Sequence, residues 1–302
     1  MVGIIQGSAE IQAYNQSYQG VVDGLMEAGY HDNFSLRLQR RIVDNQPERA
    51  FQAARELVKD GAQVLVCLGT IPTLAALKAT DGQDIPIVYT IVGAPEATGL
   101  GRPPLAKDVR FTGTSMEVPP LEQLQMLRQA IPGIKRIGIV YCPQTPQATA
   151  TGQEMAAAAG SLGLEAIVLT LPQDKLADLP TSLAPLWDQR IEALIIPTDP
   201  ILALPKYLEI ICRAAEAAWV PVQVVSDSMV PFGALLAYHC DFYDIGRQAG
   251  RQTGKILAGV PPGKVPPEQP RLRKLTVNLK MARRLGLELH RPFLSLASHL
   301  VQ

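Results

Sequence analysis

Hydroxyl and carboxylate side chains follow the predicted strands at the points where the next helices begin. In the first half of the chain, Ser8 and Glu10 follow the first strand, and Thr70 and Thr73 follow the third. Helix N-termini present unpaired N–H groups and a partial positive charge, so they bind carboxylates or phosphates. We therefore expect this half to hold the anionic group of a ligand, with the two threonine hydroxyls as further donors.

Carboxylates take the corresponding places in the second half of the chain. Thr198-Asp199 follows one predicted strand, and Ser226-Asp227 follows another. A carboxylate in a closed cleft is costly to desolvate unless it meets a cation, which the ammonium group of a ligand would supply. Donors from one half and an aspartate from the other suit a zwitterion such as an amino acid. Each of these residues is also an ordinary N-cap, so capping alone remains the alternative at any single position.

Residue patterns for catalysis or metal binding are scarce. The four histidines, at positions 31, 239, 290 and 299, form no HxH, HExxH or His–Cys pattern with ligand spacing. The segment Gly259–Lys264 has one residue too few between its glycines for a phosphate-binding loop, and Val265 stands where Ser or Thr is needed. His239 and Cys240 are neighbours in the sequence, so in a strand their side chains point to opposite faces. We expect no catalytic site, no metal and no cofactor.

Short apolar runs that alternate with longer helical patterns position these residues. Continuous apolar strands indicate a parallel sheet that helices cover on both faces. A first series consists of predicted strands at 2–6, 35–43, 64–68 and 85–89, with helices at 12–28, 47–59 and 72–79. A second series consists of predicted strands at 136–141, 164–169, 193–196 and 220–225, with helices at 146–162, 176–189 and 200–218.

The second series repeats the first at a nearly constant offset. The run that begins at Val2 (VGII) matches the run that begins at Ile137 (IGIV), an offset of 135 residues. The run that begins at Ile85 (IPIV) matches the run that begins at Val220 (VPVQ) at the same offset. We therefore predict an α/β fold with two similar doubly wound parallel-sheet lobes joined by a hinge.

The remaining elements return the chain to both lobes. A strand at 234–238, a helix at 242–258, a proline-rich connector and a strand at 273–279 follow the second series, and a short helix at 280–285 comes after them. We expect an N-terminal lobe of residues 1–115 plus 241–272 and a C-terminal lobe of residues 116–240 plus 273–302. Several chain crossings between lobes form a hinge, which suits closure over a ligand.

The composition excludes several classes of protein. The 302 residues are 47% hydrophobic and 19% charged, a balance that excludes a largely disordered chain and suggests two domains. Lys+Arg and Asp+Glu both number 28, so the chain has no excess of basic residues, and we expect no nucleic-acid partner. No apolar run reaches the ~18 residues that span a bilayer. The four cysteines, at 67, 142, 212 and 240, show no CxxC spacing, and we expect buried free thiols.

A series of segments also carries a resemblance to a known family. They include GVVDGLMEAGY at 20–30, FTGTS at 111–115, LRQAIPGIKRIGIVY at 127–141, DFYDIG at 241–246 and VNLKMARRLGL at 277–287. In their order and spacing the chain resembles the ABC-transporter substrate-binding family of the periplasmic-binding type I fold, whose better-known members resemble aromatic amino-acid (tryptophan-type) binders. The resemblance extends to about residue 287 and leaves the tail 288–302 beyond the end of the family.

The resemblance implies a function and a set of ligand contacts. It implies a non-catalytic extracytoplasmic receptor, periplasmic or lipid-anchored, with its leader removed. Such a receptor closes around an amino acid or another small carboxylate and delivers it to an ABC permease, and receptors of this shape usually work as monomers. By position, the implied ligand contacts are Ser8, Ala9, Glu10, Tyr14, Thr70, Val92, Gly93, Tyr141, Thr145, Thr198, Asp199, Ser226 and Asp227.

Departures from the family pattern and two alternatives remain. The segments 7–14 and 142–144 and the pair His239-Cys240 differ from the family, which affects the identity of the solute more than the fold. The ligand-sensing domain of a receptor or regulator is the second interpretation, because it would use the same fold. An enzyme on a doubly wound fold is the third, and it lacks a catalytic cluster.

Overall fold

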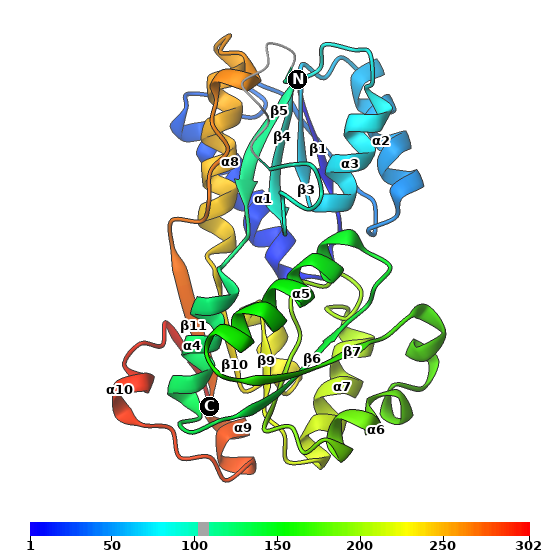
Figure 1. Cartoon of the computed structure of the whole chain (residues 1–302). Helices are drawn as coiled ribbons and strands as arrows, with labels where there is room; N and C mark the ends of the chain where they lie inside the picture. Colours follow the sequence, from blue (N-terminus) through cyan, green and yellow to red (C-terminus); the bar gives the residue numbers. More distant parts are fainter. Residues whose placement is uncertain (102–108) are drawn as a thin grey trace. The chain divides into compact units, whose positions relative to one another are not determined.

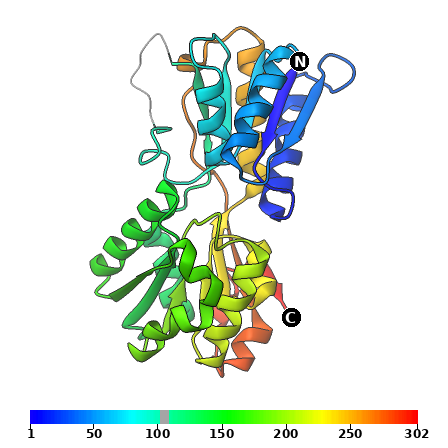
Figure 2. The ribbon, with the colours of Figure 1, turned by 90° about the vertical axis from the view of Figure 1, so that its right-hand side faces the viewer.

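The computed structural model describes residues 1–101 and 109–302. The chain forms two compact units (Figure 1; Figure 2). Unit 1 comprises Met1–Glu117 and Cys240–Leu272, and unit 2 comprises Val118–His239 and Arg273–Gln302. Unit 1 thus ends its first segment at Glu117 rather than at residue 115, and it resumes at Cys240 rather than at residue 241. The chain passes between the units at three crossing points, which follow residues 117, 239 and 272.

Unit 1 contains a five-stranded sheet in the order β2-β1-β3-β4-β5, with every neighbouring pair parallel. Its strands are β1 (Val2–Gln6), β2 (Leu38–Ile42), β3 (Val64–Leu68), β4 (Ile87–Val92) and β5 (Phe111–Ser115). Its helices are α1 (Gln12–Glu27), α2 (Pro47–Lys59), α3 (Thr70–Ala79) and α8 (Phe242–Leu257), with the short η3 (Pro262–Lys264). Helices α2 and α3 cover one face of the sheet, and α1 and α8 cover the other (Figure 1).

Glycines let α1 and α8 pack at backbone distance. In α1, a Cβ added at Gly20 would lie 2.0 Å from the carbonyl oxygen of Tyr243, and a Cβ added at Gly24 would lie 2.3 Å from the carbonyl oxygen of Arg247. A Cβ added at Gly246 of α8 would lie 2.1 Å from the carbonyl oxygen of Ser17. Only glycine fits at such distances, so helix packing fixes the residue type at these positions in the segments 20–30 and 241–246.

Unit 2 contains a seven-stranded sheet in the order β12-β11-β10-β9-β8-β6-β7. Its strands are β6 (Arg136–Tyr141), β7 (Glu165–Thr170), β8 (Ala193–Ile195), β9 (Val222–Val224), β10 (Leu236–Cys240), β11 (Arg273–Asn278) and β12 (His299–Val301). Its helices are α4 (Pro120–Ala130), α5 (Pro146–Ser161), η1 (Gln173–Asp178), α6 (Leu179–Asp188), α7 (Pro205–Ala217), η2 (Asp227–Phe232), α9 (Leu279–Arg284) and α10 (Arg291–Leu294). Two apolar clusters pack on its sheet, one with α6 and α7 and the other with α4 and α5.

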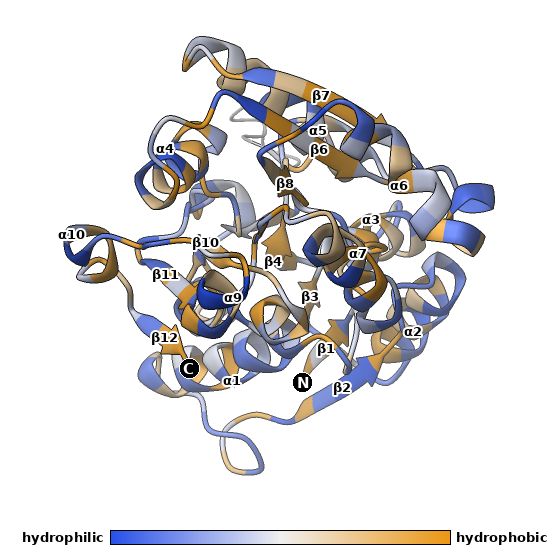
Figure 3. Ribbon diagram, turned by 90° about the horizontal axis from the view of Figure 1, so that it is seen from below, coloured by the Kyte–Doolittle hydropathy of each residue, from blue (hydrophilic) through white to orange (hydrophobic). Residues whose placement is uncertain are grey.

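The central strand β8 of unit 2 and the edge strand β2 of unit 1 differ in hydropathy. The central strand β8 is hydrophobic, whereas the edge strand β2 is largely hydrophilic (Figure 3). The residues of β8 are buried, and those of β2 are half-buried or exposed. A central strand is covered on both faces by helices, so it needs apolar side chains on both.

The predicted fold class is confirmed by the strand orders. The order β2-β1-β3-β4-β5 in unit 1 recurs as β7-β6-β8-β9-β10 in unit 2, which is the repeat found in the sequence. Several predicted boundaries were wrong. The fourth strand lies at 87–92 rather than 85–89, and the helix predicted from residue 200 begins at Pro205, because residues 200–203 form a turn. The strand β5, the helices α4 and α10, and the edge strand β12 were not predicted from the sequence.

Candidate ligand site

In unit 1 the strand order changes direction between β1 and β3. Strand β1 leads into α1 on one face of the sheet, and β3 leads into α3 on the other (Figure 1). In open parallel sheets, ligands bind outside the carboxyl ends of the strands at such a switch point. The residues after β1 and β3 are Gly7–Glu10 and Gly69–Thr73, so the predicted donors of unit 1 lie at its switch point.

The loop after β1 is held by side chains from its own unit. The amide nitrogen Nε2 of Gln6 donates to the carbonyl of Ser8 at 2.6 Å, and Nδ2 of Asn15 donates to the carbonyl of Ala9 at 3.0 Å. The Oγ atom of Ser8 accepts the amide of Glu10 at 3.1 Å. Ser8 is buried, whereas Ala9 and Glu10 are exposed. The hydroxyl hydrogen of Ser8 has no acceptor within the described ranges, so it remains able to donate to a ligand.

The side chain of Tyr14 lies beside Gly7 and Gly69, the first residues after β1 and β3. A Cβ at Gly7 would lie 2.7 Å from its ring, and a Cβ at Gly69 would lie 3.0 Å from its hydroxyl. The hydroxyl donates to Oδ1 of Asn45 at 3.3 Å. Tyr14 is only 6% exposed, and burial raises its pKa to about 12, against the opposing effect of the hydrogen bond that it donates to Asn45. The phenol therefore stays neutral at ordinary pH beside Gly7 and Gly69.

The ends of β3 and β4 complete the unit 1 edge. Gly69 has φ of +113°, and α3 starts at Thr70 without a side-chain cap. Thr70 is buried and makes no side-chain hydrogen bond within the described residues, whereas Thr73 Oγ1 donates to the carbonyl of Gly69 at 2.7 Å. Thr70 is thus the available donor, and the hydroxyl of Thr73 is used within the helix.

Val92 and Gly93 lie in a strained part of the backbone. Ile91 and Ala94, which flank them, have φ of +56° and +45°. A β-branched residue with positive φ is unusual, and such strain gathers at functional sites. The pairing of β4 with β5 also shifts register between Tyr89 and Val92. The segment is buried and ends next to the switch point, because β4 is the neighbour of β3.

Unit 2 has its own switch point between β6 and β8. Tyr141 ends β6, but its ring packs in an apolar cluster against Gly152 of α5, where a Cβ would lie 2.3 Å from the ring. Its ring is therefore part of the apolar core of unit 2. Thr145 precedes α5 as its N-cap but makes no side-chain cap bond, and its Oγ1 atom is buried without a partner among the described residues. This hydroxyl is a free polar group at the edge.

Asp199 is used by the backbone of its own unit. Its Oδ2 atom accepts the amide of Cys142 at 2.6 Å, and its Oδ1 atom accepts the amides of Ile201 and Leu202 at 2.8 and 3.0 Å. Burial raises the pKa of Asp199, and the three amides oppose this shift. The preceding residue, Thr198, is half-buried. Asp199 thus organises two loops at the switch point.

Asp227 is less fully bonded than Asp199. Its Oδ1 atom accepts the amide of Ser228 at 2.8 Å and the hydroxyl of Ser226 at 3.4 Å. The hydroxyls of Ser226 and Ser228 lie 2.8 Å apart. The Oδ2 atom of Asp227 has no partner in the part of the chain that the structure describes, and the residue is half-buried. Asp227 follows β9, the neighbour of β8, so this free carboxylate oxygen lies near the switch point of unit 2.

The structure therefore groups the predicted residues into two sets, one in each unit. It adds Asn45, which the sequence analysis missed. Asp44 and Asn45 both have positive φ, at +51° and +54°, and the amide of Asn45 donates to the carbonyl of Gly7 at 2.6 Å. The sequence Asp-Asn is a signal for such a turn because both residue types tolerate this conformation.

Cysteines, metal-binding clusters and membrane-spanning helices add no further candidate site among the described residues. All four cysteines are free and buried, which confirms the sequence prediction. Residues 1–101 and 109–302 contain no group of three or more His, Cys, Asp or Glu side chains arranged to hold a metal ion. The same ranges contain no helix with the length and apolar character needed to cross a membrane.

Two α/β units with the same strand order, polar groups at both switch points and three chain crossings define a binding protein of the type I periplasmic class. The chain belongs to the family described as ABC transporter substrate binding protein, whose model matches residues 2–301. Members of this family bind substrates, are not catalytic and work with a membrane permease. Because the match extends to residue 301, the expectation that the tail 288–302 lies beyond the end of the family is wrong.

Individual relatives are similar to this chain along most of its length, two in structure and one in sequence. A conserved domain protein from Vibrio cholerae O1 biovar El Tor strain N16961 is 27% identical, with a TM-score of 0.87 over 99% of this chain and 98% of that one. An ABC domain from Streptococcus pneumonia in complex with L-Trp is 21% identical, with a TM-score of 0.88 over 99% of each chain. A tyrosine-binding protein of Clostridioides difficile strain R20291 is 22% identical over 265 residues, which cover 88% of this chain and 74% of that protein.

Proposed function

We propose that this protein is the solute-binding component of an ABC importer and that its ligand is an amino acid, aromatic or branched. The family match supports the first part. The tyrosine-binding relative supports the second by its sequence similarity over 88% of this chain, and the L-Trp complex supports it by its shared fold over 99% of this chain. Another small carboxylate is the next choice of ligand.

The observation that carries this proposal is the difference in polar groups between the two edges. In unit 1, Ser8 and Thr70 have hydroxyls able to donate, and Thr70 stands at the N-terminus of α3. In unit 2, Asp227 keeps one carboxylate oxygen without a partner among the described residues. The ligand carboxylate meets the donors of unit 1, and the ligand ammonium meets Asp227. Asp199 fits this ammonium role less well, because three amides already use its carboxylate.

These contacts are sufficient for a transport receptor. A micromolar dissociation constant corresponds to about −8 kcal/mol. Hydrogen bonds to charged groups contribute roughly 1.5–3 kcal/mol each, so a few of them together with burial of an apolar side chain reach this value. The ring of Tyr14 and the segment Val92-Gly93 are the proposed apolar contacts in unit 1.

Ligand binding is coupled to closure in this proposal. One ligand bridges the switch-point edges of both units, and the units close around it by movement at the three crossing points. The protein acts outside the cytoplasm as a monomer, transfers the ligand to a membrane permease and catalyses no reaction. Mass spectrometry of small molecules released from the natively purified protein tests the proposal. An aromatic or branched amino acid at near one equivalent supports it, and a nucleotide, a sugar or a converted product contradicts it.

A further inference from the structure

The three chain segments that meet the crossing points are joined to one another inside unit 1. Strand β5 leads to the first crossing, α8 begins after the second, and the connector 265–272 leads to the third. The connector pairs with β5 through a parallel bridge between Thr114 and Glu268. The amide of Glu268 donates to the carbonyl of Gly113 at 2.8 Å, and the amide of Ser115 donates to the carbonyl of Glu268 at 3.0 Å. The connector therefore extends the sheet beyond β5.

The end of the connector is bonded to the start of α8. The amide of Asp241 donates to the carbonyl of Leu272 at 3.0 Å. Oδ1 of Asp241 accepts the amides of Tyr243 and Asp244 at 3.0 and 3.1 Å, so the same residue caps the helix. The second and third crossing segments are thus joined where both leave unit 1.

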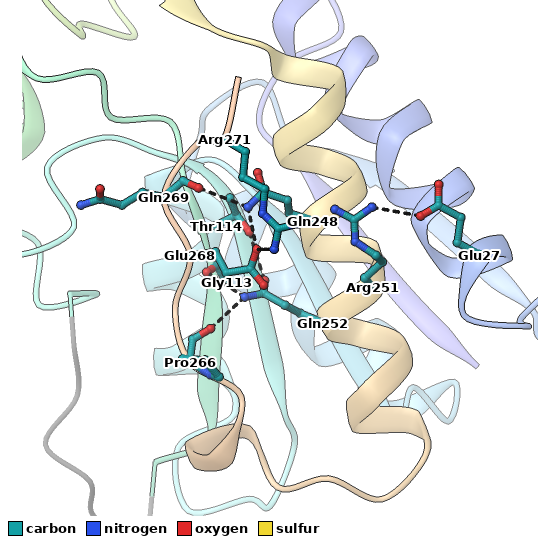
Figure 4. Close-up of polar contacts among 10 residues, drawn as sticks. All are labelled: Glu27, Gly113, Thr114, Gln248, Arg251, Gln252, Pro266, Glu268, Gln269 and Arg271. Atoms are coloured by element: carbon teal, nitrogen blue, oxygen red, sulfur yellow. Dashed lines mark hydrogen bonds and ion pairs between the residues drawn. The ribbon is translucent and has the colours of Figure 1, made fainter. Parts of the chain in front are cut away.

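Gln252, which is fully buried in α8, connects all three segments through one side chain (Figure 4). Its Nε2 atom donates to the carbonyl of Gly113 at 3.2 Å and to the carbonyl of Pro266 at 3.0 Å. Its Oε1 atom accepts the hydroxyl of Thr114 at 3.1 Å. Both hydrogens of the amide and one of its acceptor positions are used, a combination that neither a carboxylate nor an apolar side chain provides.

Gln248, one turn nearer the start of α8, bonds the connector alone, and its Oε1 atom has no partner among the described residues. Its Nε2 atom donates to Oε2 of Glu268 at 2.6 Å and to the carbonyl of Gln269 at 3.1 Å. Arg271 forms an ion pair of 2.8 Å with the same carboxylate. Hydrogen bonds to a charged group are stronger than neutral ones, and Gln248 is only 1% exposed. Breaking such a buried network leaves polar groups unsatisfied, so the network resists separation of its parts.

We propose that Thr114, Gln248, Gln252 and Glu268 are positioning residues that form a clamp at the root of the hinge. The clamp holds the three crossing segments as one body within unit 1. Movement between the units is then confined to the stretches that follow Ser115, precede Asp241 and follow Leu272. The use of the clamp in ligand-driven closure rests on the proposed function. The clamp itself does not, because it is formed by contacts within unit 1.

Amide hydrogen exchange, measured by NMR on the intact protein without added ligand, tests the clamp. The reporters are the amides of Ser115, Glu268 and Asp241, one from each crossing segment. Thr114→Val removes only the hydroxyl that bonds Gln252. We expect exchange of all three amides to rise together by about tenfold, which corresponds to the ~1.4 kcal/mol of one buried hydrogen bond. Thr114→Ser keeps the hydroxyl and should restore all three rates to within about twofold of the wild type.

Arg251→Ala is the matched control, because Arg251 lies on the same helix but pairs with Glu27 of α1 at 2.9 Å (Figure 4). It should leave the three reporter amides unchanged. If Thr114→Val is poorly folded, Glu268→Gln, which keeps an acceptor for Gln248, should raise the same three rates together by a smaller factor. Independent changes among the reporters, or an equal rise in Arg251→Ala, would overturn the clamp. Failure to bind any amino acid would contradict the proposed function. It would not affect the test of the clamp, because the exchange rates are measured without ligand.

Discussion

Oδ2 of Asp199 accepts a hydrogen bond of 2.6 Å from the backbone amide of Cys142, which connects the loop after β8 to the loop after β6. Because Oδ1 of Asp199 also accepts the amides of Ile201 and Leu202, one buried carboxylate holds two adjacent loops at the switch point of unit 2. Asp227 has the same residue type and a similar position after a strand, but one of its carboxylate oxygens has no partner in the described chain. The two aspartates therefore have different expected roles.

Asp199→Ala is expected to destabilise the protein by about 3 kcal/mol, because three buried amides lose their acceptor. Asp199→Asn should cost less, since its carbonyl oxygen still accepts Ile201 and Leu202 while its NH2 group faces the amide of Cys142. Urea unfolding measures both values. Wild-type stability in Asp199→Ala would show that the carboxylate does not hold the loops.

Asp227→Ala is expected to keep the free energy of unfolding within about 1 kcal/mol of the wild type, because only half of its carboxylate is bonded within the fold. Loss of a charge-assisted hydrogen bond to a ligand ammonium, at roughly 1.5–3 kcal/mol, should lower the affinity for L-tryptophan by about 10- to 150-fold. Isothermal titration calorimetry gives the affinity. Equal affinities of the wild type and the variant would remove Asp227 from the ammonium site.

Tyr14→Phe is expected to change how stability depends on pH. Burial raises the pKa of Tyr14 from 10.0 to about 12, so the folded state keeps the phenol proton where the unfolded state loses it. The stability from this group is fully present below pH 10 and is lost as pH rises toward 12. Between pH 9 and pH 11 the wild type should lose about 1.3 kcal/mol relative to Tyr14→Phe, at 1.36 kcal/mol per pKa unit. Parallel stability curves for the two proteins would show that Tyr14 ionises normally.

Gly24→Ala and Gly160→Ala are expected to have opposite effects. A Cβ at Gly24 would lie 2.3 Å from the carbonyl oxygen of Arg247, so α1 and α8 must separate, at a cost of about 1–3 kcal/mol. Gly160 lies in α5 with no heavy atom within 4 Å of an added Cβ, and alanine there should stabilise the helix by about 0.5–1 kcal/mol. Thermal unfolding separates the two effects. Two variants of equal stability would contradict the close packing of α1 on α8.

The sequence predicted the repeated fold because buried central strands are continuous apolar runs with helical patterns between them. It missed β5 (Phe111–Ser115) because Thr112 and Thr114 replace apolar residues, and in the structure their hydroxyls bond Val265 and Gln252. The roles of individual site residues were harder to predict. Spacing places Asp199 at a helix start, but only the fold brings the amide of Cys142 to its carboxylate.

The contact between Tyr14 and Asn45 was also beyond the sequence pattern. The two residues are 31 positions apart, and they meet because β2 and β1 are neighbours in the sheet and two residues after β2 adopt positive φ. The sequence offered Tyr14 only as a ligand contact implied by the family resemblance, and it did not indicate Asn45 as a partner. Gly7 and Gly69 leave space for its ring, because a Cβ at either position would lie about 3 Å or less from the Tyr14 side chain.

We propose that separate groups of the protein hold the carboxylate and the ammonium of one amino acid, and calorimetry with three related compounds tests this division. The three compounds share the indole ring. L-Tryptophan carries both charged groups, tryptamine carries only the ammonium, and N-acetyl-L-tryptophan carries only the carboxylate. We expect micromolar binding of L-tryptophan and at least tenfold weaker binding of each of the other two. Equal binding of all three compounds, or no binding of L-tryptophan together with none of L-tyrosine or L-leucine, would contradict the proposal.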